Sequence, residues 1–456
     1  MDYDVAVIGS GSAGKEAALL AARQGRRVAI IEEEMLGGTC FHRGCFAIRT
    51  LRACADAFRS RLFASRYGIN LDQARIRATG WATIRQRVSS HLADDLQAQF
   101  HRAHVTVHFG KATFHDDKEL RIVKDSGEWI ELTAAHVVIA TGSRPNFFAP
   151  VEMNLLNSDQ LLQITEIPRH LLIVGGGYIG CEFASIFRDL GSIVTLVEKR
   201  PRLLADWDES ASVHLLQSLR QAGVNVILGK EVDVEHVARQ RGVSLQVELG
   251  DLTITPDVTL IATGRLPNIE ELGLEVPGIR TKPFVTVDQS MRTSHPTIYA
   301  IGDINGLSML DSTALAQAQT AIDAIGGKRT HLDPRRTPRC IYTSPQMAAV
   351  GLMEEEAVKA GIDVIAGSET TELIADETLK VLDPYPTKIK IVLDARTMKL
   401  LGCLAIGDQA IDVVNLCSML IKSRAPVDRL SRYRFVHPSP AEALQRCVDR
   451  VTDRGH

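Results

Sequence analysis

The sequence has few aromatic residues, no excess of charge of one sign and no long apolar run. Aromatic residues make up 5% of the 456 positions, which disfavours a surface that stacks nucleic-acid bases. The 52 Lys and Arg residues nearly balance the 55 Asp and Glu residues, so no one-signed field attracts nucleic acid or a membrane surface. No apolar run approaches the roughly 20 residues that span a bilayer, and the first residues lack the basic leader of a secretory signal. We therefore expect a cytoplasmic protein without nucleic-acid or membrane partners.

Cysteine is present, but not in the pattern of a disulfide-stabilised fold. Eight cysteines are spread along the chain, and the cytoplasm keeps thiols reduced unless they are catalytic or redox-sensing. One pair, Cys40 and Cys45, stands close together in a distinctive setting. We interpret the other six as structural thiols: Cys54, Cys181, Cys340, Cys403, Cys417 and Cys447.

A glycine-rich turn follows the first apolar strand of the chain. Residues 4–8 are apolar and β-branched, and residues 15–24 have the composition of a helix. Glycines between a strand and a helix let the backbone approach a pyrophosphate at the helix N-terminus, and an acid ending the next strand can bind ribose hydroxyls. The motif consists of Gly9, Gly11, Gly14 and Glu32.

The same pattern returns later in the chain in matching register. Each member lies 166 residues after its counterpart, as Gly175 does after Gly9. One such cluster is also compatible with a strand–helix crossover that binds nothing, but two clusters with terminal acids favour two dinucleotide-binding units. The second motif consists of Gly175, Gly177, Gly180 and Glu198.

A second repeat closes each nucleotide unit. Residues 140–146 and 262–268 share the sequence Ala-Thr-Gly-x-x-Pro-Asn after an apolar strand, and they contain Thr141, Gly142 and Gly264. Segments with the alternating pattern of β-strands precede both repeats, at 105–132 and 224–254. We expect these segments to add small antiparallel pieces to the two sheets.

Cys40 and Cys45 follow the first unit, after Gly38 and Thr39, and lead into a helical pattern over 48–61. A helix N-terminus and the neighbouring His42 and Arg43 favour a thiolate, so one thiol is expected to ionise below the free value of ~8.5. Two other interpretations are a zinc site that includes His42, for which no further ligand cluster is evident, and two inert buried cysteines. The flanking glycines favour a redox pair, and we expect no bound metal.

These motifs together resemble the class I pyridine nucleotide-disulfide oxidoreductases, a family of flavoproteins. The resemblance continues through 338–346 and 350–351 and through 435–442, which contains the family's His-Pro-x-x-x-Glu as His437 and Glu442. It implies an α/β fold with two Rossmann-like FAD/NAD(P)-binding domains and a C-terminal α+β dimerisation domain. The implied boundaries are 1–146 for the first part of the FAD-binding domain, 147–265 for the NAD-binding domain, 266–334 for the second part of the FAD-binding domain, and 335–456 for the dimerisation domain.

The resemblance also implies roles for particular side chains. Asp303 would bind the ribityl chain of FAD, and the helix over 312–324 would point its N-terminus at the flavin. His437, oriented by Glu442, would come from the partner subunit of a homodimer and act as base towards the disulfide. Arg49, where the family usually has Lys, would pair with Glu182 beside the flavin.

The implied reaction is that of a dihydrolipoamide dehydrogenase, the branch that the chain resembles most. A dihydrolipoyl dithiol, free or on a carrier protein, would attack Cys40, Cys45 would lie against the flavin, and NAD⁺ would be reduced. Glu198 favours NAD over NADP, because a 2′-phosphate there would meet a carboxylate. The alternatives are a glutathione- or mercuric-reductase-like enzyme, a soluble pyridine nucleotide transhydrogenase, and a non-catalytic flavin redox sensor.

Three departures from that branch lie near the expected disulfide or flavin. His42 replaces the usual Asn, Ala47-Ile48-Arg49 replaces Pro-Ser-Lys, and Asp311-Ser312-Thr313 replaces Ala-His-Lys. They suggest a specialised paralog in which His42 and Arg43 tune the thiolate or bind an anionic partner.

Overall fold

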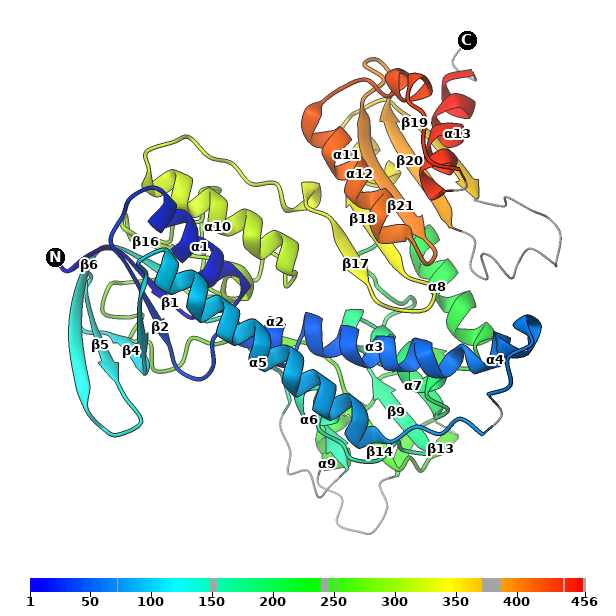
Figure 1. Ribbon diagram of the computed structural model, residues 1–456, viewed down its shortest axis with the longest axis horizontal. Helices are drawn as coiled ribbons and strands as arrows, with labels where there is room; N and C mark the ends of the chain where they lie inside the picture. The colour runs from blue at the N-terminus through cyan, green and yellow to red at the C-terminus, as the bar shows by residue number, and fades with distance from the viewer. Residues whose placement is uncertain are drawn as a thin grey trace. The chain divides into compact units, whose positions relative to one another are not determined.

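The computed structural model describes residues 1–71, 73–147, 154–238, 246–250, 252–370, 387–437 and 439–453. These residues belong to two compact units (Figure 1). The first unit comprises Met1–Leu51, Thr79–Asn146 and Gly264–Pro334, and the second comprises Arg52–Ala78, Phe147–Thr263 and Arg335–His456. The chain passes from one unit to the other after residues 51, 78, 146, 263 and 334, and the second unit takes in 52–78.

The first unit is built on a sheet with the strand order β3-β2-β1-β6-β5-β4, and β16 pairs with β6. Helical segments connect β1 to β2 and β2 to β3, and these strands pair parallel. β4, β5 and β6 follow one another through short turns and pair antiparallel, while β6 pairs parallel with β1. The strands are β1 (Tyr3–Ile8), β2 (Val28–Glu32), β3 (Thr106–Phe109), β4 (Lys111–Phe114), β5 (Glu119–Val123), β6 (Trp129–Ile139) and β16 (Ile298–Ala300).

Small side chains let the helices α1 and α10 pack closely in the first unit (Figure 1). Ala17, Ala18 and Ala21 are fully buried in the core that also contains Ala318 and Ile322 of α10. Both helices begin near the carboxyl ends of the parallel strands, where ligands bind in such sheets. The helical segments over the first and connecting parts are α1 (Ser12–Arg23), α2 (Gly38–His42), α3 (Cys45–Arg59), α4 (Arg61–Ala64), η1 (Ser65–Tyr67), α5 (Ala78–Arg102), η3 (Gly302–Asn305) and α10 (Asp311–Ile325).

Ion pairs explain why 52–78 joins the second unit. The Arg52 guanidinium is nearly buried and lies 2.5 Å from Asp189 of α7, and Arg59 lies 3.9 Å from the same carboxylate. The helix α3 thus starts in the first unit and ends in the second.

A parallel sheet with the order β11-β10-β9-β14-β8 forms the dinucleotide part of the second unit. Its central strands are buried on both faces, as their unbroken apolar sequences predict. The elements are β8 (Leu155–Leu156), α6 (Ser158–Leu161), β9 (His170–Val174), α7 (Tyr178–Asp189), β10 (Ile193–Glu198), α8 (Glu209–Gln221), β11 (Asn225–Leu228), α9 (Val234–Ala238) and β14 (Val258–Ile261).

The prediction of antiparallel additions over 105–132 and 224–254 is partly wrong. β3 and β11 pair parallel with β2 and β10, because each follows a crossover helix that reverses the chain. In the second segment β12 (Val247–Leu249) and β13 (Leu252–Ile254) form a two-stranded sheet of their own, and residues 239–245 and 251 lie outside the described residues.

The two Ala-Thr-Gly repeats pair with each other. β7 (Ser143–Pro145) and β15 (Arg265–Pro267) form an antiparallel two-stranded sheet in the first unit. The Asn268 side chain donates to the carbonyl of Thr141, and the Thr141 hydroxyl donates to the carbonyl of Asn268. The chain leaves the first unit after Asn146 and returns to it at Gly264. The paired repeats therefore connect the segments on either side of this excursion.

The C-terminal part of the second unit is an antiparallel sheet with the order β17-β18-β21-β20-β19. α12 contacts β18 and β21, α13 contacts β19 and β20, and both helices contribute to one core. The elements are η4 (Pro334–Arg336), β17 (Arg339–Ile341), β18 (Met347–Gly351), α11 (Glu354–Lys359), β19 (Val364–Thr370), β20 (Lys388–Asp394), β21 (Leu400–Ile406), α12 (Ala410–Ser423), η5 (Val427–Arg432) and α13 (Pro440–Asp453).

The predicted fold class is confirmed: two Rossmann-like sheets and a C-terminal antiparallel domain. Among the helices within the described residues, none combines the length and apolarity needed to cross a membrane.

Candidate active site

The first glycine motif forms a tight turn between β1 and α1. Gly9 has a φ of +96°, and a Cβ there would lie 2.5 Å from the carbonyl oxygen of Ala140. A Cβ at Gly14 would lie 1.8 Å from the carbonyl oxygen of Gly9, so this residue brings helix and strand together. Gly11 has no protein atom within 4 Å of such a Cβ. The first and third glycines thus serve packing, and the second leaves open space at the helix N-terminus.

The second motif repeats this geometry between β9 and α7. Gly175 has a φ of +112°, and its Cβ would lie 2.4 Å from the carbonyl oxygen of Ala262. A Cβ at Gly180 would lie 1.8 Å from the carbonyl oxygen of Gly175, whereas Gly177 has open space. The duplication in the sequence is therefore a duplication of backbone contacts.

The two terminal acids also make equivalent contacts. Glu32 accepts hydrogen bonds from the backbone N–H of Ser10 at 2.8 Å and of Glu34 at 3.0 Å. Glu198 accepts from the backbone N–H of Gly176 at 2.5 Å and of Arg200 at 2.8 Å. Each carboxylate is held at the end of its strand beside the glycine turn, where ribose hydroxyls bind in dinucleotide folds.

Asp303 lies in the first turn of η3, next to the paired repeats. It accepts a hydrogen bond from the Ser143 hydroxyl at 2.6 Å, and the Arg265 guanidinium lies 4.0 Å away. Burial raises the pKa of Asp303, against the lowering effects of Ser143 and Arg265. Gly142 precedes Ser143 in the chain and Gly264 precedes Arg265, and their φ values are +72° and +132°.

The Ser12 hydroxyl lies at the start of α1, in the first glycine turn. Its oxygen is buried and makes no hydrogen bond of standard geometry to a described residue, but it interacts with the Cys40 thiol and lowers the pKa of that group. Gly38 packs against the same turn, and a Cβ there would lie 3.0 Å from the Cα of Gly11. A buried hydroxyl beside a cradle of glycines at a helix N-terminus suits a pyrophosphate.

Glycines also fix the loop that carries the cysteines. Gly37 and Gly38 have φ values of +97° and +52°, and a Cβ at Gly37 would overlap the Phe41 ring. Phe41 is 5% exposed, and its carbonyl accepts from the Ser89 hydroxyl of α5 at 2.8 Å. α2, which contains Thr39 and Cys40, is therefore anchored on both sides.

The structure brings Cys40 and Cys45 together with a third group. Cys45 is the first residue of α3, and both thiols are half-buried. The Cys40 thiol donates to the Asp311 carboxylate at 3.5 Å, and the two sulfurs and a carboxylate oxygen all lie within 4.8 Å of one another. A hydrogen bond with Cys45 lowers the pKa of Cys40, outweighing burial and the charge of Asp311, which raise it.

His42 and Arg43 are engaged with other groups. The His42 Nε2 lies 2.9 Å from the carbonyl oxygen of Leu36, and Arg43 forms an ion pair of 2.9 Å with Glu34. Because Glu34 offsets the charge of Arg43, this guanidinium is a weaker source of positive potential at the thiols than the sequence suggests.

Glu182 lies in α7 of the second unit, whereas Arg49 lies in the part of α3 that belongs to the first. Glu182 accepts a hydrogen bond from the backbone N–H of Tyr342 at 2.9 Å. Burial raises the pKa of this carboxyl to about 7. The ion pair between the two residues stays a prediction.

His437 and Glu442 form the pair that the C-terminal motif predicts. The His437 Nδ1 lies 3.0 and 3.1 Å from the two carboxylate oxygens, and Glu442 also accepts from the backbone N–H of Ser439. The imidazole is 72% exposed and the carboxylate 21%. Glu442 thereby orients the ring at Nδ1 and leaves Nε2 on the exposed side. Pro438, between them in the motif, lies outside the described residues.

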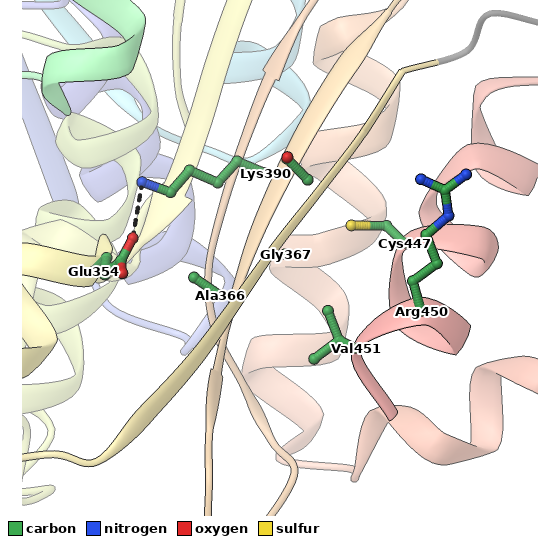
Figure 2. Close-up of a pocket in the computed structure, with 8 residues that line it drawn as sticks. Glu354, Ala366, Gly367, Lys390, Cys447, Arg450 and Val451 are labelled. Carbon is green, nitrogen blue, oxygen red and sulfur yellow. Dashed lines mark ion pairs between the residues drawn. The ribbon is translucent and has the colours of Figure 1, made fainter. Parts of the chain in front are cut away.

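A separate cavity of about 350 Å³ lies in the C-terminal part of the second unit (Figure 2). Its lysine, Lys390, forms an ion pair of 3.2 Å with Glu354. Burial raises the pKa of Cys447, which also lines it, to about 12, so that thiol stays protonated and unreactive. None of the predicted site residues lines this cavity: Glu354, Ala366, Gly367, Ser368, Lys390, Cys447, Arg450 and Val451 do.

The sequence did not predict the contact between Asp311 and the redox pair. Asp311 stands out only as a departure from the family, 271 positions from Cys40. The available signal was topological, because the helix that it begins follows a strand whose carboxyl end lies at the same sheet edge as the glycine turn.

Two family models match the chain. The model described as "Pyridine nucleotide-disulphide oxidoreductase" matches residues 3–324, and the model of the dimerisation domain of the same family matches residues 337–448.

Individual relatives match over the full length. The chain is 32% identical over 451 residues to a dihydrolipoyl dehydrogenase of Chlorobaculum tepidum, covering 97% of this chain and 96% of the relative. It is 33% identical over 459 residues to a glutathione reductase of Burkholderia cepacia, covering 97% of each. The solved structure of a Cu(II) complex of the HOCl-induced flavoprotein disulfide reductase RclA from Escherichia coli superposes with a TM-score of 0.83 at 27% identity, covering 99% of this chain and all of that one.

Proposed function

The chain belongs to the pyridine nucleotide-disulphide oxidoreductase family, and from this premise we propose that it oxidises a dihydrolipoyl dithiol with NAD⁺ through Cys40 and Cys45. As a member it is an FAD-dependent flavoprotein disulfide oxidoreductase with a dimerisation domain. The observation that carries the proposal is the meeting of the two sulfurs at the start of α3, in the unit that holds the first dinucleotide motif. The full-length similarity to dihydrolipoyl dehydrogenases supports the choice of substrate.

The reaction on the protein is two thiol–disulfide exchanges. One substrate thiolate attacks Cys40 of the oxidised pair, forms a mixed disulfide and releases Cys45 as a thiolate. The second substrate thiol then displaces Cys40, so the substrate leaves as a disulfide and the protein keeps two electrons. The lowered pKa of Cys40 makes it a good leaving group in the second exchange.

His437 supplies the base for these exchanges. With Glu442 at Nδ1, its exposed Nε2 takes the proton of each substrate thiol. The family's dimerisation domain supports a homodimer, and we place the imidazole over the redox pair of the partner subunit.

The residues of the first unit fit FAD. The Ser12 hydroxyl, the open backbone at Gly11 and the adjoining backbone of Gly38 and Thr39 would hold the pyrophosphate, Glu32 the adenosine ribose and Asp303 the ribityl chain. When bound, FAD supplies the relay of an electron pair between the thiols and the nicotinamide. The paired repeats, with Thr141 and Gly142, would fix Asp303 for that contact.

The second unit would bind NAD in preference to NADP. Glu198 is held beside the turn of Gly175, Gly177 and Gly180, where it can accept from both ribose hydroxyls and would repel a 2′-phosphate. Gly264 closes this unit at the start of the paired repeats.

A second candidate is reduction of a thiophilic metal ion with NADH. Two sulfurs and a carboxylate within 4.8 Å of one another form a mixed soft and hard donor set. The similar RclA structure is described as a Cu(II) complex.

The test is steady-state turnover with a panel of substrates. The purified holoenzyme is assayed for NADH production from dihydrolipoamide, and for NADH and NADPH oxidation with lipoamide, glutathione disulfide, coenzyme A disulfide, Cu(II) and Hg(II). We expect dihydrolipoamide and lipoamide to give the highest kcat/KM. A higher kcat/KM with glutathione disulfide or with a metal ion would overturn the proposal in favour of that substrate.

Cys40→Ser separates disulfide chemistry from hydride transfer. It should reduce lipoamide turnover by roughly a thousandfold or more, because no interchange thiol remains, while NADH oxidation by ferricyanide continues. The matched control is Cys54→Ser, which changes a thiol of α3, the helix that begins with Cys45, at a position outside the redox pair. Full lipoamide activity in Cys40→Ser would instead support a transhydrogenase.

A further inference from the structure

Asp311 places a carboxylate against the thiol that meets the substrate. It is the first residue of α10, and the Cys40 thiol donates to its Oδ1 at 3.5 Å. The Cys45 sulfur lies in the same cluster of three atoms. An acid is thus in direct contact with the redox pair, at a position that the reaction described above does not use.

The packing of α10 fixes the position of this carboxylate. Thr313 and Ala314, in the same turn, are 1% and 5% exposed, and Ala318 one turn later is fully buried against α1. The N-terminus of a helix stabilises a negatively charged side chain. The first turn of α10 therefore cannot swing the carboxylate far from Cys40 without breaking this core.

Two charged side chains have opposite effects on the Cys40 thiol: Lys15 of α1 lowers its pKa, and Asp311 raises it. Within the loop of Cys40, His42 contacts the carbonyl of Leu36 and Arg43 pairs with Glu34. Asp311 makes direct contact with the sulfur, at 3.5 Å.

We propose that Asp311 is a specificity-determining residue: its fixed negative charge beside Cys40 disfavours anionic disulfide partners relative to neutral or cationic ones. A group that forms a mixed disulfide with Cys40 must bring its own atoms within a few ångströms of this carboxylate. At such distances, in a half-buried site, like charges repel by an amount that changes rates severalfold or more.

The substrate class follows from this charge. A neutral dithiolane, such as a lipoyl group in amide linkage to a protein, avoids the repulsion, whereas glutathione and coenzyme A carry carboxylates or phosphates. The inference rests on the proposed function only in taking Cys40 as the thiol that meets the substrate.

The test compares two alkylating reagents that differ in charge. The reduced holoenzyme is treated with iodoacetamide or iodoacetate, and modification of Cys40 is followed by peptide mass spectrometry. Both reagents react with the same thiolate, so the ratio of their rates reports local charge and not thiol pKa. Asp311→Asn should raise the rate with iodoacetate relative to iodoacetamide by roughly threefold or more.

Lys15→Gln is the control of opposite sign. Removing this cation should lower the same ratio at Cys40, while Asp311→Glu, which keeps the charge, should leave it near the wild-type value. The ratio at Cys54, in the same digests, serves as the internal reference. An unchanged ratio at Cys40 in Asp311→Asn would overturn the inference.

Salt supplies a test without any variant. In the wild-type protein, the rate at Cys40 with iodoacetate relative to iodoacetamide should rise as ionic strength increases from 0.01 to 1 M. At 1 M the Debye length is roughly 3 Å, so salt screens the repulsion by Asp311. A salt-independent ratio would contradict a charge effect even if Asp311→Asn failed to fold.

Turnover gives the readout for the substrate itself. Asp311→Asn should narrow the preference for lipoamide over lipoate, which differ in one charge, by roughly threefold. If the alkylation ratio shifts but neither compound is turned over, the proposed function fails and the charge effect stands. If both compounds are turned over and the alkylation ratio is constant, the inference fails alone.

Discussion

The ionisation and hydrogen bonding of individual side chains depend on contacts that the sequence predicts only in part. Glu182 is the clearest case, because the sequence suggests an ion pair with Arg49, and the structure shows a carboxyl that accepts from Tyr342 and has a pKa raised to about 7 by burial. A raised pKa means that the folded protein binds this proton more tightly than the unfolded chain does. The contribution of Glu182 to stability is therefore fully present below pH 4.5 and is lost as the pH rises through 7.

Glu182→Gln should therefore stabilise the protein at pH 8 but have little effect at pH 4.5. The amide keeps an acceptor for the Tyr342 N–H and removes the cost of a buried charge, a difference of up to about 3 kcal/mol between the two pH values. Urea unfolding of wild type and variant at several pH values measures it.

The exposed Glu166 of the same unit provides the control, since Glu166→Gln should show no such dependence on pH. Destabilisation by Glu182→Gln at pH 8 would contradict the prediction and would indicate the ion pair with Arg49 instead.

At the same scale, we propose that Glu198 selects the nicotinamide cofactor. Glu198→Gln should raise kcat/KM for NADPH relative to NADH by about tenfold, because a neutral acceptor no longer repels the 2′-phosphate. Gly176 and Arg200 donate to different oxygens of Glu198, so the single amide oxygen of Gln can keep one of these two hydrogen bonds. Steady-state lipoamide reduction with NADH and with NADPH measures the ratio of kcat/KM values. Glu166→Gln is the control and should leave this ratio unchanged. An unchanged ratio in Glu198→Gln would show that Glu198 does not select between the two cofactors.

At the scale of elements, the two strand–turn–helix motifs use glycine for two different physical reasons. Gly180 allows α7 to approach β9, since a Cβ there would lie 1.8 Å from a backbone oxygen. Gly177 meets nothing within 4 Å and has a φ of −80°, which any residue can adopt. The fold requires glycine at position 180, and we propose that a bound dinucleotide requires it at position 177.

Matched alanine variants should separate these two reasons. Gly180→Ala should lower the free energy of unfolding by about 2 kcal/mol through overpacking. Gly177→Ala should leave it within about 0.5 kcal/mol and raise the Kd for NADH roughly tenfold. Denaturation of each variant measures its free energy of unfolding, and NADH titration measures its Kd. Equal losses of stability in Gly180→Ala and Gly177→Ala would contradict the assignment of separate roles to the two glycines.

The loop between β2 and α3 shows how local sequence prepares a site. Gly37 and Gly38 take left-handed conformations that turn the chain into α2, and the buried Phe41 fixes that short helix. Cys40 therefore lies in a short helix that the sequence pattern did not predict. Cys45 is the first residue of α3, where the helix dipole favours a thiolate, as the sequence indicated.

At the scale of the whole molecule, the proposed site needs groups from two subunits. Cys40 and Cys45 belong to the first unit and the His437–Glu442 pair to the second. Matching of the family's dimerisation domain to residues 337–448 supports a homodimer.

Mixed dimers should test the shared site. Cys40→Ser and His437→Gln homodimers should each be nearly inactive, but a dimer of one subunit of each has one site with both mutations and one with neither. After equal mixing, subunit exchange and statistical reassociation, activity should recover to about a quarter of the wild-type value. Differently tagged subunits allow the mixed dimer to be isolated. Activity that stays at the level of the parents would place both groups of a site in the same subunit.

The sequence by itself determined the fold class, the two glycine turns with their acids and the His437–Glu442 pair. Each depends on residues close together in the chain, where strand-glycine-helix order and fixed spacing prescribe the local conformation. The equal offset of 166 residues indicated two units in matching register, and in the structure Glu32 and Glu198 make equivalent contacts.

Only the tertiary structure decided what lies between segments distant in sequence. The parallel pairing of β3 and β11 follows from crossover helices, and the pairing of β7 with β15 joins repeats that the sequence assigned to separate units. The contact of Asp311 with Cys40 spans 271 positions and depends on how α10 packs against α1. Such contacts are fixed by the packing of whole elements, whose relative positions no local pattern encodes.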